Sequence, residues 1–555
     1  MERAFDTTGN SSIGRAFLCT SQPTIRRNSI LYLVSVCIGS LRIYRYRTSK
    51  LFPAQRRSSR GSLVVLATIN VSQFSVFIAL FIIVIGIGLY SGHWRSGDME
   101  SVDEWGLGGR KFGGFVTWSL QGGSIYTTYS FVAIPALIFG TGALGFYAMP
   151  YLVIAYIFGY IVLPPLWDHA KARGHVTVAD IVKDNMGSKV PAILVAFTGI
   201  IATMPYVALQ VYGIQVCISE IGIPLTASLW AAFIVLAVVT YVSGLRAAAL
   251  IAIAKDFLIW TTVIVALIYI PMQLGGYHHI FAHLPTSSTV LPKNLWLGYS
   301  TLALGSGLAL FVYPHSTTGT LSASSRRAVE HNSVLLPIYT LMLGMLALLG
   351  YMALVANVHP STRFASNIAV PGLFEKIFPA PFAGFALAAI AIGALVPASV
   401  MAIAAANLFT RNIYKELFGD KLSSSAETHV SKIASLFVKF GGVAFIVFAS
   451  SKYVVNFQLA GGVWIVQILP MVVIPIFFTW VNMKSAVLGW AAGMGWGTYI
   501  LITDHFNSSL HKLDLFGHHL DVYTAIPALL INLIITLGGS LLVRVFTPSK
   551  QLVSA

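Results

Sequence analysis

The sequence predicts an all-α integral membrane protein with about thirteen membrane-spanning helices. Of its 555 residues, 56% are hydrophobic and only 10% are charged, whereas soluble domains carry roughly 25% charged residues. A soluble protein of this size could not bury so much apolar surface. The alternating apolar and polar residues of a membrane β-barrel are not found in the sequence. This composition excludes a soluble enzyme or DNA-binding protein, and the net charge of +16 is interpreted as a feature of membrane topology.

Thirteen apolar runs are each long enough to cross a hydrocarbon core, which takes about 20 helical residues. They cover about residues 73–92, 114–140, 146–167, 190–218, 226–244, 248–271, 296–315, 334–356, 382–407, 432–450, 454–478, 485–503 and 523–543. The runs are expected to be helical because lipid cannot satisfy the polar groups of a bare backbone.

The connections between the runs predict the orientation in the membrane. If the connection after the first run is cytoplasmic, the inner segments hold sixteen Lys and Arg residues and the outer connections hold five. Because basic residues favour the cytoplasmic side, we expect a multi-pass protein of the cytoplasmic (inner) membrane. Its N-terminus would lie outside and its C-terminus in the cytoplasm.

Residues 1–62 differ from the rest of the chain. They hold eleven of the 35 Lys and Arg residues but only two acidic residues. Their apolar run, about residues 30–40, is too short to span a bilayer. We expect this segment to be a disordered extension or one that is not translated in the native protein. The transporter domain would cover residues 63–545, followed by a short cytoplasmic tail of residues 546–555.

Two of the apolar runs are interrupted by glycine. The interruption in the second run contains residues expected to bind substrate: Gly122, Gly123, Ser124, Tyr126 and Thr127. The seventh run has a corresponding set: Gly305, Ser306 and Gly307. Two interrupted spans at corresponding places predict a binding site between inverted repeats, here about residues 114–271 and 296–478. The alternative is that these glycines only allow close packing of helices.

Charged residues are rare within the apolar runs, which makes each of them informative. Lys255 and Asp256 lie in the sixth run, and Lys439 lies near the start of the tenth. Both lysines could extend to the inner interface, and we expect this of Lys439. For Lys255 an equal alternative is that it is buried and exchanges a proton.

The sequence carries no motif of a catalytic or nucleotide-driven protein. It has no Walker loop, kinase motif set or nucleophile elbow. The three cysteines have neither a disulfide pattern nor metal-ligand spacing. His315, after the seventh-run interruption, could relay protons or simply cap a helix. We therefore predict no enzyme activity, no cofactor and no metal site.

Several short motifs, taken together and in order, resemble the sodium/solute symporter family. They are Gly108-Gly109-Arg110, Gly140-Thr141-Gly142, Ser243-Gly244-Leu245-Arg246-Ala247, Tyr313-Pro314-His315 and Asn412-Ile413-Tyr414. Within that family the run Ile253-Ala254-Lys255-Asp256 is most similar to the monocarboxylate permease branch. The resemblance implies a leucine-transporter-like fold with a 5+5 inverted repeat, and uptake of acids such as lactate, pyruvate or acetate.

The resemblance also identifies positions expected to bind the coupling cation. In sodium-coupled members the ion lies between backbone carbonyls of the second span and paired hydroxyls of the ninth. The corresponding residues here are Gly123, Tyr126, Gly393, Val396 and Pro397. Valine and proline cannot supply the expected hydroxyls, although Ser399 would restore one oxygen if the alignment shifts by two positions.

This departure leads to a hypothesis about coupling. Lys255 is expected to border the cation position, so its ammonium could replace sodium and couple transport to protons. The sequence thus predicts a secondary active transporter that imports small monocarboxylates, with the proton or sodium as the coupling ion. The alternative is a sodium-coupled symporter for a neutral solute such as an amino acid, sugar or vitamin. The expected partners are the monocarboxylate, the coupling cation and the lipid bilayer, with no nucleic acid; the oligomeric state stays open.

Overall fold

The structure is a computed structural model that describes residues 69–91, 100–419, 423–448, 452–515 and 518–546. All of them belong to one of the two units into which the chain divides, residues 66–555. The predicted N-terminal extension, residues 1–62, lies outside the described residues. So does the predicted tail apart from Phe546. What the sequence predicts for both segments therefore stays a prediction.

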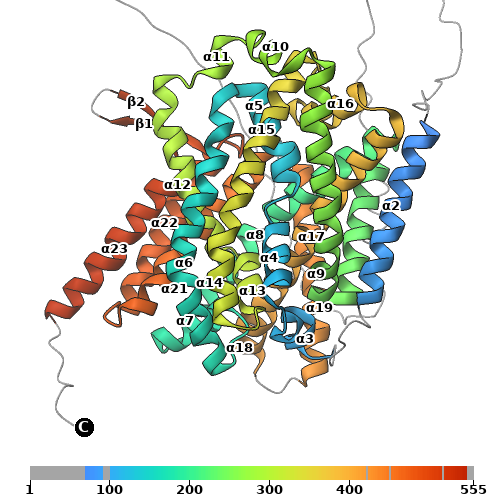
Figure 1. Cartoon of the computed structure of the whole chain (residues 1–555). Helices are drawn as coiled ribbons and strands as arrows, with labels where there is room; N and C mark the ends of the chain where they lie inside the picture. Colours follow the sequence, from blue (N-terminus) through green and yellow to red (C-terminus); the bar gives the residue numbers. More distant parts are fainter. Residues whose placement is uncertain (1–68, 92–99, 420–422, 449–451, 516–517, 547–555) are drawn as a thin grey trace, which may run out of the picture. The chain divides into compact units, whose positions relative to one another are not determined.

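The described chain is helical almost throughout (Figure 1). Its first half contains α2 (Val71–Tyr90), α3 (Val102–Leu107), α4 (Gly114–Gly123), α5 (Ile134–Thr141), α6 (Ala148–Arg173), α7 (Val178–Met186), α8 (Lys189–Glu220), α9 (Leu225–Gln273), α10 (Gly276–Ala282) and α11 (Thr286–Thr289). Its second half contains α12 (Trp296–Val312), α13 (Pro314–Leu321), α14 (Arg326–Leu335), α15 (Tyr339–Val355), α16 (Ala369–Ile377), α17 (Ala380–Phe409), α18 (Lys415–Phe418), α19 (Ser424–Phe448), α20 (Val455–Ile465), α21 (Leu469–Phe477), α22 (Met483–Thr503) and α23 (Ala525–Phe546).

Eleven helical segments among the described residues are long and apolar enough to cross a membrane. A shorter apolar helix, Leu225–Tyr241, comes in addition. Some predicted runs merge, since the segment Tyr129–Arg173 joins the second half of the second run to the third. These segments make the chain an α-helical, multi-pass membrane protein. The count of thirteen spans and the 5+5 repeat stay predictions.

The long helix α9 is divided at Gly244, the last residue of the run predicted at 226–244. Gly244 has φ 56° and ψ −149°, a backbone conformation that is essentially restricted to glycine. A Cβ on this residue would lie 2.5 Å from the carbonyl oxygen of Trp105. Glycine is therefore needed here both for the turn of the chain and for its close approach to α3.

The predicted interruption of the second span is present. Helix α4 ends at Gly123, and the chain resumes helical structure only from Thr128, first as a π-helical turn, Tyr129–Ala133. In between, the amides of Ser124 and Tyr126 donate to carbonyls of the last turn of α4. The backbone between the two helical parts is thus free to present its own carbonyl groups to other elements.

The interruption predicted at Gly305–Gly307 in the seventh span is wrong. Helix α12 is continuous there and ends at Val312, and the chain turns only at Tyr313, which has φ −57° and ψ 141°. Pro314 explains why the helix ends here, because it cannot donate a backbone hydrogen bond and disfavours helical geometry in Tyr313, the residue before it. Added Cβ atoms would lie 2.6 Å from Tyr523 at Gly305 and 2.8 Å from Ile154 at Gly307, so both glycines allow close helix packing.

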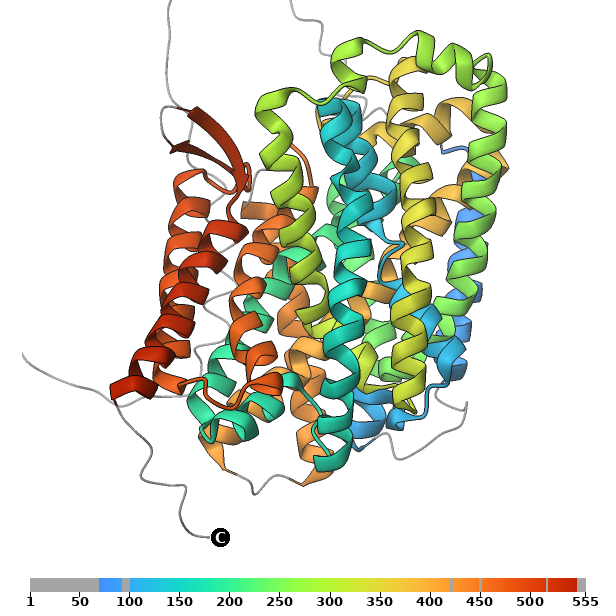
Figure 2. The ribbon, with the colours of Figure 1, turned by 60° about the vertical axis from the view of Figure 1, so that its left-hand side comes forward.

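Helix α17 forms the centre of the described structure. Its apolar window is buried along the whole length, and it packs against α2, α8, α9 and α19. Alanines dominate its sequence, and small side chains let neighbouring helices approach closely in a membrane protein. Figures 1 and 2 show α22 and α23 side by side at the edge of the bundle.

A β-hairpin is present that the sequence analysis did not predict. The connection between α22 and α23 contains an antiparallel hairpin of β1 (Leu510–Leu515) and β2 (His518–Tyr523), with Leu513 paired to Leu520. Its strand β2 packs against α12. Apolar and polar residues alternate only over residues 513–515 in β1 and 520–522 in β2. This is too short a strand pattern to stand out between two long apolar runs.

Candidate functional site

The break in the second span brings two backbone carbonyl groups together, those of Gly123 and Tyr126. Lys255, on the second half of α9, points at both of them. Its Nζ donates to the carbonyl oxygen of Gly123 at 2.5 Å and to that of Tyr126 at 3.0 Å. Lys255 is fully buried, so the alternative in which it extends to the membrane interface does not describe this structure. The ammonium group occupies the point where the two carbonyls meet.

An acidic residue accompanies this lysine. Asp256 Oδ1 lies 3.8 Å from Lys255 Nζ, and Asp256 Oδ2 accepts a hydrogen bond of 2.7 Å from Ser119 Oγ on α4. Asp256 is almost completely buried. A buried cation is tolerated when charge and hydrogen-bond acceptors surround it. Here two carbonyls and one carboxylate provide that environment.

The positions expected on the ninth span contribute unequally. Gly393 of α17 lies beside the break, because a Cβ on it would be 3.7 Å from the carbonyl oxygen of Tyr126. Val396 and Pro397 are buried in α17 and have no side-chain oxygen. Ser399 Oγ instead donates to the carbonyl of Leu395 at 2.9 Å and accepts from Thr240 at 3.1 Å. The structure thus gathers Gly123, Tyr126, Lys255 and Gly393, with Ser399 bonded elsewhere.

A small cavity lies on another side of the break, between α4, α6, α12, α13 and α17. Its volume is about 20 Å³, room for about one water molecule. The polar residues that line it are Gln121, Ser124, Tyr156, His315 and Ser316. Most of its remaining wall is apolar, formed by residues such as Ile125, Leu310 and Phe311.

The residues predicted to bind substrate have different surroundings. Ser124 lines the cavity. An added Cβ on Gly122 would meet the ring of Tyr339 at 2.4 Å, and the Tyr126 ring lies 4.5 Å from that same ring. Thr127 Oγ1 accepts a hydrogen bond from the Tyr129 amide at 3.0 Å. Gly122, Tyr126 and Thr127 therefore pack within the region of the break and are not among the residues that line the cavity.

The second predicted set is separated from the cavity. Gly305, Ser306 and Gly307 are not among its lining residues, because the turn of the seventh span comes at Tyr313. Sequence analysis also missed Gln121 and Ser316, and it placed no binding role on His315. One available signal was Pro314, which marks the end of α12 more reliably than the glycines within it.

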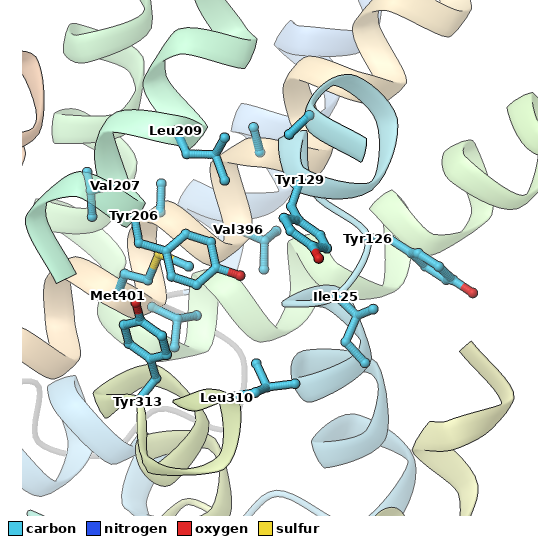
Figure 3. Close-up of a cluster of buried hydrophobic side chains, with 14 of the residues drawn as sticks. Ile125, Tyr126, Tyr129, Tyr206, Val207, Leu209, Leu310, Tyr313, Val396 and Met401 are labelled. Atoms are coloured by element: carbon cyan, nitrogen blue, oxygen red, sulfur yellow. The ribbon is translucent and has the colours of Figure 1, made fainter. Parts of the chain in front are cut away.

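Aromatic side chains pack near the cavity and the break. Figure 3 shows Tyr206, Tyr313 and Met401 in one cluster of buried side chains, with Tyr126 and Tyr129 pointing in different directions. The rings of Tyr206 and Tyr313 lie 5.3 Å apart, and all four tyrosines are buried.

The prediction that Lys439 of α19 extends to the inner interface is wrong. Lys439 does not extend along the outside of the helix but is fully buried, and its Nζ donates to Ser435 Oγ at 3.3 Å. Neither of the break's carbonyls is among its hydrogen-bond partners. Lys439 is therefore a buried lysine outside the cation position and serves below as a matched control.

One cluster within the described residues has the composition of a metal site, namely His169, His175 and Asp184. Arg173 is already bonded to it, with Nη1 lying 2.8 Å from His169 Nε2 and 3.2 Å from Asp184 Oδ2. An arginine held in this way repels a second cation. We therefore assign no metal to this cluster.

Comparisons with known proteins place the chain in a family. The model of the sodium:solute symporter family matches residues 105–493. A protein of Rhizobium johnstonii called a monocarboxylate transport permease is 43% identical over 88% of this chain and 99% of its own length. An uncharacterized symporter of Bacillus subtilis, YodF, is 32% identical over 78% of this chain and 88% of its own length.

Two solved structures have a similar fold. A sodium-coupled sialic acid symporter in a substrate-bound, outward-open state matches with a TM-score of 0.68 at 16% identity, over 87% of this chain and 99% of its own. A nucleobase-cation-symport-1 family transporter in a closed conformation gives a TM-score of 0.51 at 10% identity, over 82% and 97%. At such low identity these likenesses concern the fold alone. The family match and the relatives carry the assignment: the chain belongs to the sodium:solute symporter family.

Proposed function

We propose that the protein is a secondary active transporter that imports small monocarboxylates together with protons. Membership of the symporter family supports solute transport coupled to a cation. The substrate class is supported by the 43% identity to a relative named as a monocarboxylate transport permease, which spans almost the full length of that relative. The coupling ion is argued from this chain's own residues.

The observation that carries the coupling proposal is the position of Lys255. Hard cations such as sodium need several oxygen ligands at short range. At this break, Val396 and Pro397 offer no side-chain oxygen, while the carbonyl oxygens of Gly123 and Tyr126 already accept hydrogen bonds from Lys255. A covalently attached cation thus takes the place that a bound ion would need.

Protonation of Lys255 would replace the binding of a coupling ion. The charged ammonium holds the broken second span against α9 through the two carbonyls. When it loses its proton it has fewer donors and no charge, so this link between the two elements weakens. Residues of the broken second span line the cavity. A change in the hydrogen bonds of Lys255 can therefore alter the cavity in which we propose that substrate binds. Such coupling of a midplane site to movement of helix bundles is the general mechanism of alternating access.

We propose the same orientation that the sequence predicts, with the N-terminus outside and the C-terminus in the cytoplasm of the inner membrane. Figure 1 shows α3, α7 and α18 at one end of the bundle and α10, α11 and α16 at the other. The first group carries or adjoins basic residues that include Arg110, Lys183 and Lys415. An excess of basic residues at one end supports a cytoplasmic location for that end.

A counterflow screen tests the substrate class. Proteoliposomes containing the purified protein would be loaded with unlabelled lactate, pyruvate, acetate, alanine or proline and diluted into labelled lactate. We expect the monocarboxylates to drive lactate uptake with or without sodium, and the two amino acids to drive little, after subtraction of protein-free vesicles. Absence of lactate uptake, together with counterflow of labelled alanine or proline that requires sodium, would instead support the alternative function.

A further inference from the structure

His315 is a buried polar side chain whose hydrogen-bonding capacity is unused. It is 1% exposed, and neither Nδ1 nor Nε2 has a hydrogen-bond partner. Its ring packs edge-on to Tyr206, with centroids 5.4 Å apart, and lies 5.3 Å from the ring of Tyr313. Buried polar groups are nearly always paired, and an unpaired one calls for an explanation. The proposed coupling mechanism does not use this histidine.

The place of His315 in the fold supplies an explanation. It lines the cavity together with Gln121, Ser124 and Ser316. It is the second residue of α13, which begins with Pro314 directly after the turn at Tyr313, and no side chain caps the start of this helix. The first amides of a helix lack partners within it and carry partial positive charge. The imidazole and the start of α13 thus offer N–H donors at one end of the cavity.

The rest of the cavity has a different character. Its walls include Ile125, Ala155, Leu163, Leu310 and Phe311, none of which can form a side-chain hydrogen bond. A ligand that matches this lining has one anionic end, which accepts hydrogen bonds, and a short apolar end. Small monocarboxylic acids have this form. Ligand sites are typically apolar with a few placed polar groups.

We propose that His315 is a substrate-binding residue that donates a ring N–H to the carboxylate of the transported acid. The inference rests on the proposed function and deepens it by naming the residue that receives the anionic end. In either protonation state the imidazole has at least one N–H to donate. In this conformation the cavity has room for about one water, so the acid enters when α13 and the broken second span move apart.

The experiment compares lactate uptake by four proteins in proteoliposomes: wild type, His315→Gln, His315→Leu and Tyr206→Phe. Glutamine keeps an N–H donor of similar reach, so its KM should stay within about threefold of the wild-type value. Leucine fills the space without a donor, and loss of a hydrogen bond to a charged group should raise KM by about tenfold or more. Tyr206→Phe retains the ring that packs on His315, and its KM should not change.

A second measurement separates binding from a structural role. Lactamide has the shape of lactate without its charge, and its inhibition constant is measured against each variant. If His315 receives the carboxylate, His315→Leu should lose most of the preference for lactate over lactamide, whereas a packing defect would weaken both ligands alike. Should His315→Leu fail to fold, His315→Asn takes its place, because its shorter amide cannot reach as far as that of glutamine.

The outcomes distinguish the two levels of the argument. If wild type transports lactate and the donor-free variant keeps the wild-type KM and preference, the assignment of His315 is overturned and the proposed function stands. Equal loss of lactate and lactamide binding overturns the assignment as well. If wild type transports none of the acids, the proposed function fails first and the assignment fails with it.

Discussion

At the scale of the residue, two buried lysines differ in their hydrogen-bond partners. Lys255 and Lys439 both lie in apolar helices and are fully buried. Only Lys255 contacts the carbonyls of the broken span, those of Gly123 and Tyr126, whereas Lys439 donates to the hydroxyl of Ser435. Variants of the two lysines can therefore distinguish the effect on transport of removing any buried lysine from the effect of removing the lysine at the break.

Replacement of Lys255 tests its role directly. In Lys255→Met the chain keeps a side chain of similar length, but the carbonyls of Gly123 and Tyr126 lose their donor, at a cost of about 1–3 kcal/mol each if they stay unpaired. We expect uptake of labelled lactate driven by a pH gradient to fall at least tenfold. Lys439→Met should retain most of this uptake. Equal rates in Lys255→Met and wild type, with the same dependence on pH, would rule out the coupling role.

The sequence could predict part of this site at the level of residues. Lys255 and the break are visible because charges and paired glycines are unusual in an apolar run. The roles of Gly305 and Gly307 could not be predicted in the same way. A glycine that allows close helix packing and a glycine that interrupts a helix cannot be distinguished from the sequence alone. What separates them is the neighbour, here Tyr523 and Ile154, and these neighbours come from elements distant in the chain.

At the scale of the element, the positions of the turns organise the site. The turn after α12 places His315 at the cavity, and the turn within α9 at Gly244 directs its second half, with Lys255, toward the break. A proline forces the first turn, whereas the glycine only permits the second, because its backbone can adopt a positive φ. The turn at Pro314 is therefore predictable from the sequence, whereas the turn at Gly244 also depends on its contact with Trp105.

Gly244 gives a stability prediction. Gly244→Ala introduces a side chain where φ is positive and where the Cβ would lie 2.5 Å from the Trp105 carbonyl. The backbone strain alone is on the order of 1–3 kcal/mol, and the clash adds to it, so we expect the melting temperature in detergent to fall clearly.

The matched control is Gly86→Ala in α2. A Cβ there meets nothing within 4 Å, and alanine is favoured over glycine within a helix by about 1 kcal/mol. Thermal unfolding followed by tryptophan fluorescence should therefore show an unchanged or slightly higher transition for Gly86→Ala. A Gly244→Ala protein that melts together with wild type would contradict the assigned need for glycine.

At the scale of the whole molecule, the sequence predicts the class of protein more reliably than its detail. Low charge and long apolar runs predict an α-helical membrane protein, because a helix satisfies its own backbone in lipid and the strands of a barrel would alternate apolar and polar residues. The runs predicted at residues 382–407 and 190–218 correspond to α17 and α8, which pack against each other in the core. The cavity could not be predicted, because its walls come from five elements that meet only in the folded bundle.

The central claim is that a lysine replaces sodium as the cation at the break, and gradient-driven uptake tests it most directly. Proteoliposomes in sodium-free potassium buffer would be given an inside-alkaline pH gradient and labelled lactate, with protein-free vesicles subtracted for passive entry of the acid. The account predicts accumulation of lactate above equilibrium without sodium, and its collapse on addition of a protonophore. Accumulation that requires a sodium gradient and withstands the protonophore would contradict it.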